Sequence, residues 1–441
     1  MRFAMNKTMS SYRSGIRNIL LIWLAWVLIL IGFQALATAR LQPQFPDRAQ
    51  LWTEFSTGKN YQLGHPFLLD PFMNNQVAWD SEYYLGIATG GYEEPNVSHL
   101  QPFGNVVFDY HTLLQGGAYV GRNLSLSYAF FPLYSWITWL LAWPLKLLGL
   151  TPIATSTLAG VIVSVLGALG AMLALYDLTH DSLGEEGALR AAFYLLIFPT
   201  GFFLAQVYTE GLFVGLAFGC LAMLRRRYWL PAALLGAAAT LTRAVGLALI
   251  IPMGITWILS NEWLDFDMEW RQMYFSGIPW RPIGKALLVS APLLAFLLWK
   301  ISYLGSAFDY VQTNFFGRHL LDFGAAYYSW TDAYKSLFMG IPERTVYFLT
   351  EFIGLSIGVV CCLACLKRYP EVAWFSLAVL VISFGSGPAQ SLQRYVLGAP
   401  AVFVMLAYWG KNPVFDRAWT IFSTLLMGLL AVLFAFNFWV A

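Results

Sequence analysis

The chain has 441 residues, of which 58% are hydrophobic and only 11% are charged, and its mean hydropathy is +0.60. An ordinary soluble domain carries about 25% charged residues, so this composition excludes one and indicates a polytopic membrane protein. The formal net charge of +2 gives no indication of a nucleic-acid partner, and we predict none. We expect an all-α protein whose partner is the lipid bilayer.

The first predicted element is a membrane helix near the N-terminus. Four basic residues between Arg2 and Arg17 precede an apolar run over residues 19–38. This run is longer than the core of a signal peptide, so we predict a retained helix with a cytoplasmic N-terminus.

A long polar segment follows this helix, from Arg40 to Ser127, and contains no apolar run long enough to cross a membrane. Because it follows one crossing, we expect it on the extracytoplasmic side. A connection of this length has a binding or catalytic role more often than a passive one. We predict a second outer loop over residues 305–340, and a single membrane-embedded domain over residues 1–441.

Apolar segments fill most of the remaining sequence. They lie at residues 128–150, 152–176, 188–205, 207–224, 228–259, 284–304, 341–366, 371–385, 394–410 and 418–440. Residues 228–259 are too long for one span and carry Arg243 in their middle, so we predict two short helices that meet there. About 11 transmembrane helices are then expected, apart from residues 128–150.

Three basic clusters constrain the topology: residues 225–227, Lys367-Arg368, and Lys411 with Arg417. The positive-inside rule places all three in the cytoplasm. They fall there only if one early segment does not cross. Residues 128–150 contain three tryptophans and a Trp-Pro break, so we predict that they form a re-entrant or interfacial helix.

This topology predicts that several polar residues meet on the outer side of the membrane. They are Asp80, Glu82, Glu210, Arg243, Gln390 and Arg394. Charged residues at membrane depth are costly and usually functional.

The stretch Trp79-Asp80-Ser81-Glu82 supplies the candidate catalytic acids, Asp80 and Glu82. Asp80 is the preferred general base, because the apolar ring of Trp79 would raise the pKa of a neighbouring carboxyl. The alternative is that Asp80 only caps a helix that begins near Ser81.

Glu210 and two arginines allow two interpretations. Glu210 could bind substrate or could only complement a helix dipole. Arg243 and Arg394 lie between apolar runs. They could neutralise carboxylates such as Glu210, or they could clamp phosphate oxygens with their planar forks.

Arg318 and His319 in the second loop could add to a phosphate clamp, although a lone histidine is more often a structural hydrogen-bonding residue. Four cysteines lie within apolar segments, and the sequence has no nucleotide-binding or metal-binding motif. We therefore predict no cofactor and no metal.

Together these residues suggest a reaction between a lipid phosphate ester and an acceptor from outside. The phosphate would leave with its charge stabilised by Arg243 and Arg394. Asp80 would deprotonate an acceptor hydroxyl, and the rings of Trp79, Tyr83 and Tyr84 would stack on a sugar. A lipid or solute transporter is the alternative.

Five motifs in a fixed order carry a resemblance to a known family. They are WDSEYYLGIATGGY at 79–92, FFPLYSW at 130–136, FPTGFFLAQVYTEGLF at 198–213, RRRYWLPAALLGAAATLTRAVG at 225–246 and LQRYVLGAP at 392–400. The chain resembles the GT-C glycosyltransferases that use polyprenyl-phosphate sugars, and within them the GPI mannosyltransferase II (PIG-V) type.

The resemblance implies a GT-C fold and an inverting transfer of mannose or another hexose from a polyprenyl or dolichyl phosphate. It implies a glycolipid or glycan acceptor and a catalytic acid that matches Asp80. Short loops and few lysines favour a prokaryotic relative, and therefore a bacterial plasma membrane, with the endoplasmic reticulum membrane as the alternative.

Overall fold

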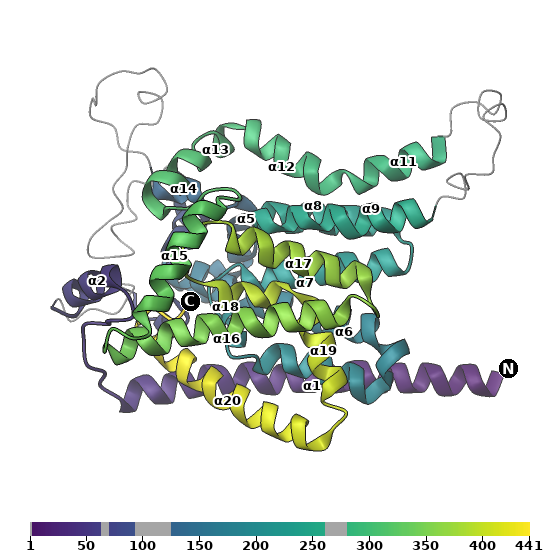
Figure 1. Ribbon diagram of the computed structural model, residues 1–441, viewed down its shortest axis with the longest axis horizontal. Helices are drawn as coiled ribbons and strands as arrows, with labels where there is room; N and C mark the ends of the chain where they lie inside the picture. The colour runs from purple at the N-terminus through teal and green to yellow at the C-terminus, as the bar shows by residue number, and fades with distance from the viewer. Residues whose placement is uncertain (1, 63–69, 93–124, 261–279) are drawn as a thin grey trace.

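The computed structural model describes residues 2–62, 70–92, 125–260 and 280–441. Every regular element in these residues is a helix, which confirms the all-α prediction (Figure 1). Parts of the first outer loop, residues 63–69 and 93–124, lie outside the described residues.

Four described helices are long and apolar enough to cross a membrane. They are the apolar part of α1 (Arg2–Arg40), α6 (Pro152–Ile197), α16 (Pro342–Cys365) and α20 (Pro413–Ala435). Shorter apolar helices complete the bundle: α8 (Trp229–Thr242), α9 (Ile250–Leu259), α12 (Ala291–Ile301), α17 (Pro370–Phe384) and α19 (Pro400–Trp409). The chain is a polytopic membrane protein.

Helix α6 contains two of the predicted spans, which meet at a sharp break. Gly184 has φ 73° and ψ 178°, a conformation that glycine adopts without steric cost. The second part of α6 ends at Ile197, directly before Phe198-Pro199, because proline disfavours a helical conformation in the residue before it.

The basic cluster at residues 225–227 packs against the first part of α6 and against α9. Arg226 forms an ion pair with Asp177, and Arg225 lies 3.0 Å from Asp181. Arg227 donates a hydrogen bond to the carbonyl of Thr256, 3.1 Å away.

The contact between Arg227 and Thr256 joins the start of α8 to the end of α9. Helix α8 ends at Arg243, whose extended backbone is followed by the short helix η6 (Ala244–Leu249). Residues 228–259 therefore form a hairpin with Arg243 at its far tip, as predicted.

Helix α5 (Pro132–Leu145) has 14 residues. At 1.5 Å per residue it is about 21 Å long, shorter than a hydrocarbon core of about 30 Å. The hydroxyl of Ser135 donates to the carbonyl of Tyr84, and Thr151, after the helix, bonds to Asp70. Ser135, near the start of α5, and Thr151, after its end, thus both contact residues 70–92, and that α5 is re-entrant or interfacial stays a prediction.

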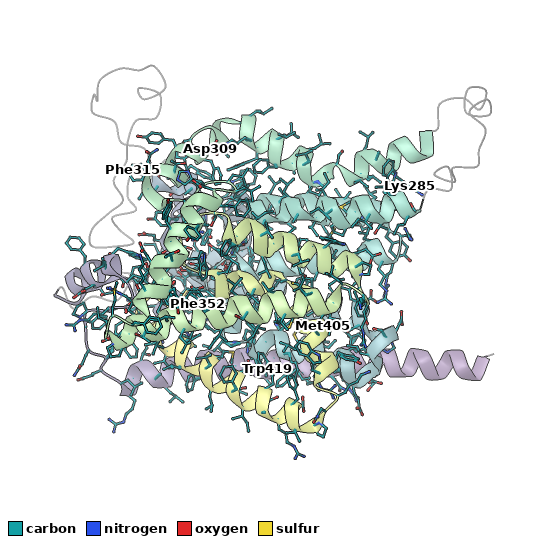
Figure 2. The ribbon with its side chains drawn as sticks, viewed as in Figure 1. Lys285, Asp309, Phe315, Phe352, Met405 and Trp419 are labelled. Carbon is teal, nitrogen blue, oxygen red and sulfur yellow. The ribbon has the colours of Figure 1, made fainter. Side chains whose placement is uncertain are left out.

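The opposite end of the bundle from the N-terminus carries the smaller helices α2 (Leu51–Gln62), α3 (Ser81–Gly90), α14 (Phe308–Phe316) and α15 (Phe323–Ser336). In Figure 1, α15 crosses the ends of the bundle helices at a steep angle, and the C-terminus lies nearby. In Figure 2, Asp309 and Phe315 lie near this end and Lys285 near the other.

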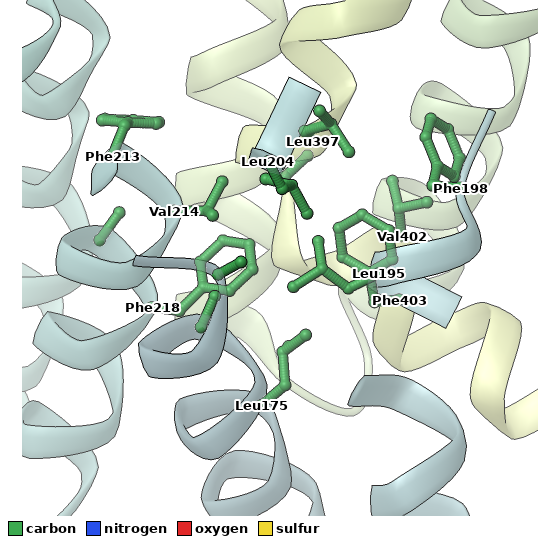
Figure 3. Close-up of a cluster of buried hydrophobic side chains, with 14 of the residues drawn as sticks. Leu175, Leu195, Phe198, Leu204, Phe213, Val214, Phe218, Leu397, Val402 and Phe403 are labelled. Carbon is green, nitrogen blue, oxygen red and sulfur yellow. The ribbon is translucent and has the colours of Figure 1, made fainter. Parts of the chain in front are cut away.

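The core lies between α6, α7 (Glu210–Arg225) and α19. Leu175, Leu195, Phe218 and Phe403 meet there (Figure 3). The backbones of α6 and α7 approach so closely that a Cβ atom on Gly167 would lie 2.3 Å from the carbonyl oxygen of Gly211. Small residues at such a crossing are typical of packed membrane helices. They also fix the start of α7, where Glu210 lies.

Cysteine labelling tests this topology. In a background without the four native thiols, an impermeant maleimide should label Asp332→Cys, on the exposed side of α15, in intact cells. Arg226→Cys should react only after the membrane is opened, because the positive-inside rule places that end in the cytoplasm. Labelling of both positions in sealed cells would contradict the arrangement.

Candidate active site

Asp80 lies in the turn that enters α3. Its neighbour Trp79 has a φ of 51°, so the backbone bends sharply there. The Asp80 carboxylate makes no capping hydrogen bond to α3, which argues against the purely structural interpretation. It instead lies 3.3 Å from Nη1 of Arg394, and its side chain is 21% exposed.

Glu210 forms ion pairs with both predicted arginines. Its Oε1 forms an ion pair with Nη1 of Arg243 and lies 3.3 Å from Nε of Arg394. Glu210 and Arg394 are only 3% and 4% exposed, and Arg243 also donates to Thr209 Oγ1 at 3.1 Å. The structure therefore contains the carboxylate pairing that the sequence left open as an alternative to the clamp.

The four charges Asp80, Arg394, Glu210 and Arg243 form a row of alternating sign, which we call the charge row. Arginine stays protonated at any physiological pH, so Arg243 and Arg394 are the two cations of the row.

Tyr395 gathers three guanidinium groups around its ring. The guanidinium carbons of Arg243, Arg394 and Arg318 lie 4.7, 5.2 and 5.6 Å from the ring centroid. The site is strongly cationic around this ring.

Arg318 differs from the other two arginines in its partner. Its Nη1 donates to Ser386 Oγ at 3.0 Å, and no carboxylate in the described part of the chain lies within ion-pair distance. The three arginines around Tyr395 thus outnumber the carboxylates of the charge row by one, which leaves a net positive charge.

Tyr208 is a site residue to which the sequence analysis gave no role. Its hydroxyl donates to the carbonyl of Ala78 at 3.1 Å and accepts the N–H of Asp80 at 3.2 Å. Its ring lies 5.2 Å from the guanidinium carbon of Arg394. Tyr208 therefore orients both members of the Asp80–Arg394 pair. Its place two residues before Glu210 was the available signal.

The aromatic residues beside Asp80 differ from the expectation that they stack on a sugar. Tyr83 lies flat against Phe130 with ring centroids 4.6 Å apart, and Tyr84 is buried. Trp79 packs edge-to-face with Trp52 and Trp439. These rings find partners within the protein because each buries a large apolar area.

The remaining predicted residues lie at varied distances from the charge row. Glu82 is buried in the first turn of α3, next to Tyr83. His319 is exposed, and its backbone N–H bonds to the carbonyl of Ser386. Gln390 is half-buried four residues before Arg394. The structure brings Asp80, Glu210, Arg243 and Arg394 together, and no contact joins His319 or Gln390 to them among the described interactions.

No known family model and no curated protein matches this chain. Among solved structures, it is similar to ArnT from Cupriavidus metallidurans bound to undecaprenyl phosphate, with 14% identity and a TM-score of 0.44, over 81% of this chain and 67% of that one. It is also similar to the archaeal oligosaccharyltransferase AglB from Archaeoglobus fulgidus in complex with an inhibitory peptide and a dolichol-phosphate. That match has 14% identity and a TM-score of 0.41, over 94% of this chain and 56% of AglB. The chain thus spans just over half the length of AglB.

Substitution of Glu210 tests whether the charge row is a true ion-pair network. Glu210→Gln leaves two buried guanidinium groups without their shared carboxylate, so we expect a loss of about 3–5 kcal/mol in stability. The loss should appear as a lower thermal transition in detergent. Asp177→Asn, which removes a partly exposed ion pair with Arg226, is the control and should have a much smaller effect. An unchanged transition for Glu210→Gln would show that the pairs are not formed.

Proposed function

We propose that this chain is a membrane-embedded, inverting glycosyltransferase of the GT-C type. It would take a sugar, with mannose as the first candidate, from a polyprenyl or dolichyl phosphate and transfer it to a glycolipid or glycan acceptor on the outer face. The observation that carries the proposal is the charge row at the outer end of an apolar bundle. Buried charges at such a place are costly and are typical of a substrate site.

The three guanidinium groups around the Tyr395 ring suit the donor phosphate. Two arginines of the predicted clamp already share Glu210, so the clamp is revised to include Arg318, whose partner is only a hydroxyl. Fixed guanidinium groups stabilise charge on a departing phosphate without reorganisation. Their planar forks also match phosphate oxygens better than an ammonium does.

Asp80 suits the acceptor side because it is the more exposed carboxylate of the row. In the proposed step the acceptor oxygen attacks the anomeric carbon, and the bond from that carbon to the phosphate oxygen breaks. The acceptor proton passes to Asp80, and the lipid phosphate leaves toward the arginines. Attack opposite the leaving group inverts the anomeric centre.

The resemblance of the five sequence motifs supports the proposed sugar and lipid classes, and the geometry of the charge row supports the proposed roles. Short loops favour a bacterial plasma membrane over the endoplasmic reticulum. The proposal is tested with purified protein in detergent and radiolabelled polyprenyl-phosphate mannose, with consumption of the donor as the signal.

Asp80→Asn should lower transfer by roughly 10²–10⁴-fold, because it removes the general base. Donor turnover and the thermal transition should be measured on the same preparation, and the transition should stay close to that of the wild type. Glu82→Gln is the matched control in the same turn. Activity of Asp80→Asn within a few-fold of the wild type would rule out Asp80 as the general base. If only Glu82→Gln is inactive, Glu82 is the general base instead.

Arg318→Ala should weaken donor binding about tenfold or more, since hydrogen bonds to a charged group contribute about 1.5–3 kcal/mol. Its stability should change little, because no carboxylate is left unpaired. Arg48→Ala, at an exposed ion pair with Glu54, is the control for loss of an outer-side cation. Unchanged donor affinity in folded Arg318→Ala would exclude this arginine from the phosphate site.

A further inference from the structure

A fully buried carboxylate, Glu351, lies within the membrane helix α16 and has no role in the steps described so far. A carboxylate inside an apolar helix is costly unless hydrogen-bond donors satisfy it. No salt bridge to Glu351 is present among the described residues, so its donors must come from elsewhere.

Three donors converge on this carboxylate. Its Oε1 accepts the hydroxyl of Tyr347 at 2.9 Å and the backbone N–H of Ser391 at 2.7 Å. Its Oε2 accepts the backbone N–H of Gln393 at 3.0 Å. Two of the three donors belong to the turn that directly precedes Arg394.

Gln393 is held by three hydrogen bonds. Besides the bond from its N–H to Glu351, its carbonyl accepts the hydroxyl of Thr200 at 3.1 Å, and its side-chain amide donates to the carbonyl of Val440 at 2.6 Å. One turn along α16, a Cβ atom on Gly354 would lie 2.8 Å from the Cβ of Gln393. Gly354 therefore permits the close approach that brings the turn to Glu351.

The turn also contains a strained residue. Ser391 has a φ of 66°, which is uncommon for a residue other than glycine and persists only where the surroundings enforce it. The bond from its N–H to Glu351 is such a constraint. Without it the backbone would relax, and the position of Arg394 three residues later would change.

The same carboxylate is linked to the Asp80 side of the ion pair. The hydroxyl of Tyr347 accepts Nε1–H of Trp439 at 3.0 Å. The Trp439 ring packs on Trp79 with centroids 5.4 Å apart, and Trp79 precedes Asp80. Glu351 is thus linked to Arg394 through the backbone of the preceding turn, and to the Asp80 segment through the side chains of Tyr347, Trp439 and Trp79.

We propose that Glu351 is a positioning residue that holds the turn 391–393, so that Arg394 stays within ion-pair distance of both Asp80 and Glu210. Both distances are 3.3 Å, and a shift of about 1 Å would break either contact. The effect on catalysis rests on the proposed glycosyl transfer, whereas the effect on the ion pairs does not.

A double-mutant cycle with Glu351→Gln and Arg394→Ala tests this role. The glutamine keeps the size of the side chain but turns an N–H donor toward a backbone N–H. If Glu351 acts through Arg394, the two losses are not additive, in thermal stability and in transfer. Glu351→Gln alone should lower kcat about tenfold or more and raise the donor KM less, because Arg318 still binds the donor.

Ser376→Ala is the matched control, since Ser376 is a buried polar residue of α17 that accepts the backbone N–H of Ala401. Its effect should add to that of Arg394→Ala. Additive losses of thermal stability for Glu351→Gln and Arg394→Ala would overturn the positioning role. A wild type without transfer activity would refute the proposed function instead, and non-additive stability in that protein would still support the positioning role.

Discussion

One buried guanidinium, that of Arg394, joins distant segments of this protein. It lies between Asp80 and Glu210, at 3.3 Å from each, and only 4% of it is exposed. Its partners come from the first outer loop and the start of α7, and Asp80 is 314 positions away in the chain. A cation in this position is stable only if both carboxylates are held in place, so the surrounding fold must fix all three segments.

The helix bundle fixes these three segments by different contacts. Glycine contacts between α6 and α7 set the position of Glu210, and Tyr208 bonds to the turn that carries Asp80. Glu351 accepts two backbone N–H groups of the turn before Arg394. Buried ion pairs contribute little net stability, because desolvation offsets most of their attraction. Their value in a transferase would be that charges already in place stabilise a leaving phosphate without reorganisation.

The sequence predicted the membrane class, the hairpin at Arg243 and the gathering of Asp80, Glu210, Arg243 and Arg394 on one side. These followed from apolar run lengths and the positions of basic clusters, which are local properties of the chain. The sequence could not decide whether the arginines pair with carboxylates, because such pairing depends on distances between segments far apart in sequence.

The aromatic partners of Trp79 and Tyr83 could not be predicted for the same reason. Trp439 and Phe130 lie in other parts of the chain, and no spacing rule connects them to the first loop. Glu351 did give a signal, since an acid within an apolar run is unusual. It was missed because two of its three donors are backbone groups of a distant turn.

The proposed recognition of a lipid-linked phosphate by the arginines around Tyr395 is tested most directly by binding measured with and without that phosphate. Purified protein in detergent would be titrated with a polyprenyl phosphate and with the polyprenol of the same chain length. The phosphate compound should bind at least about tenfold more tightly than the polyprenol, as expected for charged hydrogen bonds. Equal affinity for the two lipids would contradict it.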